Sequence, residues 1–364
     1  MLLKDIYSKQ FYNRISDVFE TTIPSFKKAS FLKKIFTPDF ESKELKARMR
    51  HTSVVLHEFL PKDYKQTVSI FERSIQSFRE NGIGEDGLAF MFLPDYVEHF
   101  GVDDYETSVR AIEFITQFVS CEFAVRPFLL RYEDKMMEQM LRWASHENHK
   151  VRRLASEGCR SRLPWAMAVP ALKKDPAKIL LVLEQLKNDP SEWVRRSVAN
   201  SLNDIAKDHP QIVLDIAKKW SGIGKETDAI IKHGSRTLLK QGHVEILKHY
   251  GLDSKHILVD HFKIIRSKIK VGAYLEFSFD VTNKSRTKQK VRLEYAVYFQ
   301  KQNGQLSKKV FKISEKDYAP KATEPVTRKQ SFAPITTRKY YPGLHKLSII
   351  VNGEEKAIGD FELA

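Results

Sequence analysis

The chain has 364 residues, 42% of them hydrophobic and 29% charged, and its formal net charge is +15. This length favours two domains over one, and the apolar content excludes a disordered chain. The chain has only two cysteines and neither a signal-like N-terminus nor a long apolar run, which predicts a cytoplasmic protein with no disulfide scaffold and no membrane partner.

The first part of the chain, residues 1–253, is predicted to form an all-α domain. Apolar residues recur at three- and four-residue steps in segments such as 53–78 and 106–130. That spacing places them on one face of a helix, so both segments are expected to be amphipathic helices packed on a core.

An internal repeat organises the end of this helical part. The segment "VRRLASEGC" (151–159) recurs as "VRRSVANSL" (194–202) and, more weakly, as "IKHGSRTLL" (231–239). Each copy follows an apolar helix, and the copies begin 43 and 37 residues apart. Helix pairs that recur at such intervals are typical of a HEAT-like-repeat solenoid. The apolar residues expected in the core of the first two copies are Val151, Leu154, Ala155, Val194, Val198, Leu202 and Ile205.

Cations line the other face of the repeated helices. In the first copy, Arg153, Glu157 and Arg160 share the face opposite the core stripe. Stacked repeats would align such cations into columns that match a sugar-phosphate backbone. The same pattern is also typical of an ordinary solvated face, with Arg153 and Glu157 as an i,i+4 pair. The candidate DNA-binding residues of the helical part are Arg152, Arg153, Arg160, Arg195, Arg196, Lys232 and His233.

The last part of the chain, residues 254–364, is predicted to be a small all-β sandwich. Alternating apolar and polar residues, rich in β-branched and aromatic types, fill several short segments separated by turn residues. The Cys…Trp…Cys pattern of antibody domains is missing, so the domain is immunoglobulin-like in architecture only. The segments with the clearest alternation are 273–283, 290–301, 308–314 and 344–353.

Positive charge increases along the chain. Residues 1–149 have 20 cationic and 23 acidic side chains, residues 150–253 have 19 and 12, and residues 254–364 have 22 and 11. Such a gradient indicates an anionic partner for the second half of the chain, most commonly nucleic acid.

One β segment, residues 283–292, is especially basic. It contains five cations and no acid. The candidate DNA-binding residues there are Arg286, Lys288 and Lys290, and the alternative is a hairpin that only adds solubility.

Three residues are candidates for chemistry. Glu157 lies among arginines, and Glu122 interrupts an apolar run, where a carboxylate costs free energy unless it is paired or used. Glu122 could also simply pair with Arg126, one turn further on. Trp165 follows Leu163-Pro164, where it could be a core plug or a stacking platform. Phosphate-loop, serine-hydrolase and metal-site motifs are missing, so no cofactor and no metal are expected.

Two long segments carry a family resemblance. "RRLASEGCRSRLPWA" (152–166) and "DPSEWVRRSVANSLNDIAKDHP" (189–210) resemble the HEAT-like-repeat DNA alkylation repair glycosylases, in particular the AlkC branch. The β-sandwich is similar to the immunoglobulin-like domain of many AlkC proteins, so the resemblance spans essentially the whole chain.

The resemblance implies a function for these residues. The implied reaction is excision of N3-methyladenine and N3-methylcytosine from duplex DNA, without a deep base-flipping pocket. Glu157 and Glu122 would be the catalytic carboxylates and Trp165 an aromatic wall, while Arg153 would hold a phosphate beside the lesion. The β-sandwich would close around the far side of the DNA, and a monomer would suffice.

Two other functions fit the sequence. A non-catalytic DNA- or RNA-binding HEAT scaffold would have the same cationic face, and a protein–protein adaptor could use that face to bind an acidic partner. Glu157 separates the glycosylase from the scaffold, because a pure phosphate binder gains nothing from an acid among its cations. A steep dependence of binding affinity on salt would separate both of these hypotheses from most protein–protein adaptors.

Overall fold

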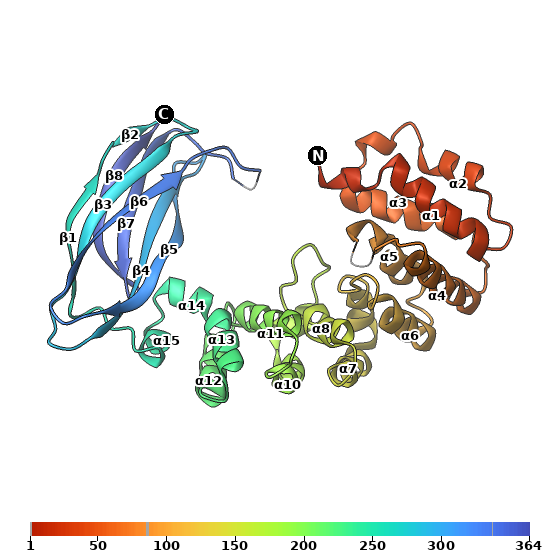
Figure 1. The fold of residues 1–364 in the computed structure, drawn as a ribbon, viewed down its shortest axis with the longest axis horizontal. Helices are drawn as coiled ribbons and strands as arrows, with labels where there is room; N and C mark the ends of the chain where they lie inside the picture. Colours follow the sequence, from red (N-terminus) through yellow and green to blue (C-terminus); the bar gives the residue numbers. More distant parts are fainter. Residues whose placement is uncertain (1, 85–86, 337) are drawn as a thin grey trace. The chain divides into compact units, whose positions relative to one another are not determined.

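The structure, a computed structural model, describes residues 2–84, 87–336 and 338–364. Helices extend to His249 and strands begin at Ile257, so the prediction of a helical part followed by an all-β part is confirmed (Figure 1). None of the helices in these ranges combines the length and apolar character that crossing a bilayer requires.

The helices have the following bounds. They are α1 (Lys9–Thr22), α2 (Lys28–Ile35), α3 (Leu45–His57), α4 (Tyr64–Glu80), α5 (Phe92–Phe100), α6 (Tyr105–Ile115), α7 (Val125–Trp143), α8 (His149–Gly158), α9 (Pro170–Lys174), α10 (Ala177–Leu186), α11 (Glu192–Ile205), α12 (Pro210–Trp220), α13 (Lys225–Gly234), α14 (Arg236–Gln241) and α15 (Val244–His249). Short 3-10 helices lie at Leu3–Ile6, Phe40–Ser42 and Leu88–Met91.

Contacts divide the chain into two compact units. The first contains residues up to 209 together with 220–234, and the second contains 210–219 together with 235–364. In the first unit α8 packs against α7, α10 and α11, and α11 packs against α13. The predicted core residues of both repeat copies are buried. The repeated helices therefore stack on one another through the apolar stripe that their spacing predicts.

The second unit contains a β-sandwich. The strands are β1 (Ile257–Ile264), β2 (Lys268–Ile269), β3 (Tyr274–Asn283), β4 (Gln289–Gln300), β5 (Leu306–Tyr318), β6 (Thr323–Ser331), β7 (Gly343–Val351) and β8 (Glu354–Leu363). They form a three-stranded sheet in the order β1-β3-β6 and a five-stranded sheet in the order β2-β8-β7-β4-β5. Neighbouring strands are antiparallel except β2 and β8, which run parallel.

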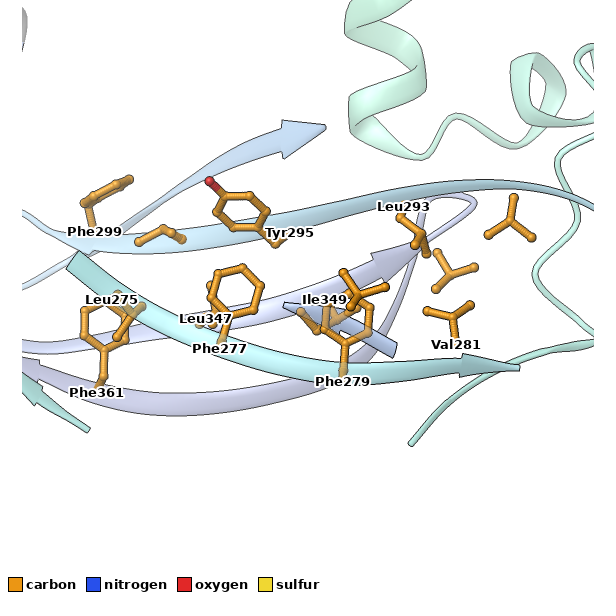
Figure 2. Close-up of a cluster of buried hydrophobic side chains, with 14 of the residues drawn as sticks. Leu275, Phe277, Phe279, Val281, Leu293, Tyr295, Phe299, Leu347, Ile349 and Phe361 are labelled. Atoms are coloured by element: carbon orange, nitrogen blue, oxygen red, sulfur yellow. The ribbon is translucent and has the colours of Figure 1, made fainter. Parts of the chain in front are cut away.

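The inner faces of the two sheets make one apolar core. Phe277 and Phe279 of β3 point toward Leu347 and Ile349 of β7, and the Phe277 ring lies 5.1 Å from that of Tyr295 between centroids (Figure 2). Alternate residues of each strand point inward because successive side chains in a strand face opposite ways. The four segments with clear alternation correspond to β3, β4, β5 and β7.

The chain before the sandwich packs onto it. An added Cβ on Gly242 would lie 2.8 Å from the carbonyl oxygen of Gly353, so the two loops meet at their backbones. Nδ2 of Asn352 donates a hydrogen bond to the carbonyl oxygen of Asp253 at 2.7 Å. Residues 235–256 therefore belong physically to the β unit, although α14 and α15 are helical.

Candidate active site

Helix α8 fits closely against α7 through Gly158. An added Cβ on Gly158 would lie 2.6 Å from Cγ2 of Val125 and 3.3 Å from Cε of Met140, both side chains of α7. At the other end of α8, the Asn148 side chain caps the helix by accepting a backbone N–H of the first turn. Because Gly158 has no side chain, the last turn of α8, which carries Glu157, can approach α7.

Glu157 is buried rather than exposed. It is 5% exposed, so the prediction that it lies on an exposed face is wrong. Its Oε1 accepts a hydrogen bond from Nη1 of Arg160 at 2.6 Å and lies 4.0 Å from Nη2 of Arg153. Arg160, itself 7% exposed, also donates from Nε to Oδ2 of Asp204 at 2.8 Å. Its guanidinium is thus buried between two carboxylates. Arg160 is therefore less suited to bind a phosphate than an exposed cation would be.

Glu122, in the turn just before α7, also pairs with Arg153. Its Oε2 accepts hydrogen bonds from Oγ of Ser120 at 2.8 Å and from Nη1 of Arg153 at 3.0 Å. The alternative pairing of Glu122 with Arg126 does not form, because Arg126 donates to backbone carbonyls instead. Arg153 therefore lies between the two candidate carboxylates. Glu122 is 31 residues before it in the chain, and Glu157 is four residues after it.

Trp165 borders a cavity beside Glu122. The tryptophan is 65% exposed and has a φ of 64°, so it is not a core plug. The cavity has a volume of about 270 Å³. Its lining is mainly apolar and includes Tyr7, Met49, Met91, Phe123, Trp165 and Trp193, together with the polar residues Lys46, Ser120, Glu122 and Arg153.

Trp193 also lines the site, although the sequence pattern did not single it out. It is 53% exposed in the first turn of α11, and Cζ of Arg153 lies 5.7 Å from its ring centroid. Trp193 and Arg153 also line a second recess of about 230 Å³, which contains Glu157 and Asn200. The two carboxylates thus line neighbouring recesses that share one arginine and one tryptophan. The sequence feature that could have indicated Trp193 is its position directly before Val194, next to the core stripe of the second repeat copy but outside it.

Arg152 has a structural environment. Its Nε and Nη2 bond the two carboxylate oxygens of Asp189 at 2.5 and 3.0 Å, and its Nη1 donates to the carbonyls of His146 and Glu147. This pairing raises the pKa of Arg152 because the neighbouring carboxylate favours the charged guanidinium. Arg195 similarly donates to the backbone carbonyl of Asp189. Both side chains hold the turn before α11 in place. Their guanidinium groups are engaged within the protein, so this geometry does not support the predicted phosphate contacts.

Further candidate DNA-binding residues surround another recess. Arg196 is exposed, and with Arg195, Lys225 and His233 it lines a recess of about 370 Å³ between α11 and α13. Nε2 of His233 lies 3.2 Å from Oδ1 of Asn200. Arg196 and His233 therefore lie at the same recess, and Lys232 precedes His233 in α13.

The basic segment 283–292 connects β3 to β4, which lie in different sheets, so the expectation of a hairpin is wrong. This basic connection is exposed and ordered. The side chains of Arg286, Lys288 and Lys290 are exposed, and Nζ of Lys288 lies 2.9 Å from Oδ2 of Asp317. Asn283, which is fully buried, orders the turn by donating from Nδ2 to the carbonyl of Thr287 at 2.9 Å.

Glu98, on α5, has an unusual pKa. It is largely buried next to Asp95, and these two factors raise its pKa from 4.5 to about 7, although Arg50 and Lys46 oppose the shift. The folded state therefore binds a proton more tightly than the unfolded state, and the stability from this group is lost as pH rises from about 4.5 to about 7.

Replacement of Glu98 by Gln is expected to remove a pH-dependent loss of stability of about 3 kcal/mol. The measurement is urea unfolding of wild type and variant between pH 5 and pH 8, with the difference in unfolding free energy plotted against pH. A difference that stays constant over this range would contradict the assignment.

Comparison with known proteins agrees with this geometry. Residues 62–234 match the family model described as DNA alkylation repair enzyme, and residues 258–364 match the C-terminal Ig-like domain of YhaZ. The described residues contain no group of three or more His, Cys, Asp or Glu side chains that could hold a metal ion. Fold and site together define a DNA alkylation repair protein with helical repeats and an added immunoglobulin-like domain.

Two full-length relatives specify the family. The chain is 44% identical over 362 residues to the uncharacterized protein YhaZ of Bacillus subtilis strain 168, with 99% of each chain covered. It is 34% identical to the alkylpurine DNA glycosylase AlkC of Pseudomonas fluorescens bound to DNA containing an abasic site analog, with 100% of each chain covered and a TM-score of 0.94. The chain belongs to the AlkC family of DNA alkylation repair glycosylases.

Proposed function

We propose that this protein is a monofunctional DNA glycosylase that removes cationic alkylated bases, N3-methyladenine and N3-methylcytosine, from duplex DNA in the cytoplasm. One observation carries the proposal. Two carboxylates, Glu122 and Glu157, line neighbouring recesses that share Arg153 and are bordered by exposed tryptophans. A phosphate-binding scaffold needs cations and has no use for this pair of acids.

The chemistry follows from the charge of the substrate. An N3-methylated base is already a cation, so it leaves without protonation by an acid. When the N-glycosidic bond breaks, its electron pair goes to the base, which becomes neutral, and the sugar becomes an oxocarbenium-like cation. Glu157 and Glu122 would stabilise that cation electrostatically. Water then adds to the anomeric carbon of the sugar and gives its proton to a carboxylate or to solvent.

Aromatic and cationic neighbours would complete the site. Trp165 and Trp193 can offer ring faces to a charged base or to the sugar. Arg153, Arg196 and His233 would contact phosphates on one side, which would hold the lesion at the recesses. We expect the duplex to bend so that the nucleotide reaches these recesses, without insertion of the base into a deep pocket.

The decisive experiment uses methylated duplex DNA. Purified protein should release N3-methyladenine and N3-methylcytosine, detected by chromatography, and leave abasic sites. Tight DNA binding without base release would instead support the non-catalytic scaffold.

The basic β3–β4 connection gives a separate prediction. Replacing Arg286, Lys288 and Lys290 by Gln is expected to flatten the dependence of log Kd on log salt by up to about three slope units if each cation contacts one phosphate. This test is sharper than truncation after residue 253, which would cut through the β unit.

The matched control for this triple variant replaces three lysines elsewhere in the same sandwich, Lys268, Lys346 and Lys356, by Gln. The change in net charge is the same, so equal slopes for the two triple variants would show that the β3–β4 connection makes no specific phosphate contacts.

A further inference from the structure

The loop that follows α8, residues 159–169, holds Trp165 in an unusual conformation. Trp165 has a φ of 64°, a region that a non-glycine residue adopts only when its surroundings hold it there. The loop's own hydrogen bond next to Trp165 is long, with the N–H of Ala166 donating to the carbonyl of Leu163 at 3.4 Å. Contacts from outside the loop must therefore contribute to its conformation.

Arg126 of α7 supplies such contacts at both ends of the loop. Its Nη1 donates to the carbonyls of Gly158 at 2.8 Å and Arg160 at 2.9 Å, and its Nε donates to the carbonyl of Met167 at 2.8 Å. The residue is 1% exposed, and this burial lowers its pKa to about 10, so it is still protonated at neutral pH. The three carbonyls satisfy a buried cation and tie the start of the loop to its end.

Lys46 of α3 supplies the contact at the tryptophan itself. Its ammonium donates a hydrogen bond to the carbonyl oxygen of Trp165, a residue 119 positions away in the chain. The same ammonium lies 5.1 Å from the ring centroid of Phe123, which directly follows Glu122. Lys46 thus connects the backbone of Trp165 to the segment that carries one of the carboxylates, along the wall of the shared cavity.

We propose that Lys46 is a positioning residue, which holds the Trp165 indole at the edge of the cavity beside Glu122, while Arg126 fixes the ends of the same loop. The proposal predicts that loss of the Lys46 ammonium releases the loop around Trp165. Its kinetic consequence rests on the proposed glycosylase function, but its structural consequence does not.

The structural test uses 5-fluorotryptophan and fluorine NMR of the free protein. The chain has four tryptophans, and a Trp165→Phe variant identifies the Trp165 resonance. In Lys46→Met this resonance should sharpen and move toward that of free 5-fluorotryptophan, while the other three stay in place. Lys46→Arg keeps a cationic donor and should restore the wild-type position. Lys65→Met, an exposed lysine on α4, is the matched control.

The kinetic test measures single-turnover release of N3-methyladenine. The rate constant of Lys46→Met should fall about 10-fold because the aromatic wall is misplaced, with Kd for the duplex within about twofold of wild type. Lys46→Arg should recover most of the rate. Replacement of Arg126 risks unfolding, so the Lys46 variants carry the test.

Two results would overturn the proposal. One is an unchanged Trp165 resonance in Lys46→Met. The other is a raised Kd with an unchanged rate at saturation, which would make Lys46 a phosphate contact. If wild type releases no base at all, the proposed function fails, and the fluorine spectra still decide whether Lys46 positions the loop.

Discussion

Replacement of Glu157 by Gln is expected to lower the single-turnover rate of N3-methyladenine release by about 10²- to 10³-fold, the range seen when a preorganised electrostatic group is removed from an active site. Gln has nearly the same shape as Glu and can still accept a hydrogen bond from Arg160. It lacks the negative charge that would oppose the developing cation on the sugar. Affinity for undamaged duplex is expected to stay close to wild type, because Glu157 itself should contact no phosphate.

The control for this variant is Asp204→Asn. Asp204 bonds the same guanidinium of Arg160 as Glu157 does, on the Nε side. If the loss in Glu157→Gln came from disturbing the buried ion pairs, Asp204→Asn would lose base release to a similar degree. Equal rates for Glu157→Gln and wild type would remove Glu157 from the reaction and leave Glu122 as the candidate carboxylate.

Replacement of Arg152 by Met is expected to lower the free energy of unfolding by about 3–5 kcal/mol, because it leaves a buried carboxylate without its cation. The carboxylate is that of Asp189, whose side chain is 3% exposed. The measurement is urea unfolding, followed by fluorescence of the buried tryptophans Trp143 and Trp220.

Arg196→Met provides the matched comparison for Arg152. Arg196 is exposed in α11, so its replacement should change stability by less than about 0.5 kcal/mol. It should instead weaken duplex binding and reduce the salt dependence by about one slope unit. The opposite pattern, with Arg196→Met unstable and Arg152→Met weak in DNA binding, would restore Arg152 as a phosphate contact.

These two arginines show where the sequence is informative and where it is not. Periodicity correctly predicts which side of each repeated helix is apolar, because the stripe follows from helix geometry alone. It does not reveal that Asp189, 37 residues after Arg152, reaches back to pair with it. Glu157 and Arg160 are buried for the same reason, since Asp204 approaches them from the next repeat.

The strands also differ in how well the sequence predicts them. Strands with many core residues, such as β3 and β4, have strong apolar alternation and are predicted with nearly their observed bounds. By contrast, β6 lies at the edge of its sheet, and Val326 is its one buried residue. Edge strands are often polar and can contain proline, here Pro325, so their sequences resemble loops.

The buried side chain of Asn283 has a consequence for whatever the basic β3–β4 connection binds. It donates not only to Thr287 but also to the carbonyls of Tyr318 and Ala319, at 3.2 and 3.0 Å. The turn is therefore already ordered before any ligand arrives. A flexible basic loop loses conformational entropy when it binds an anion, whereas this connection has lost most of that entropy on folding. Its cations can therefore contribute their attraction to an anionic partner with little opposing entropy.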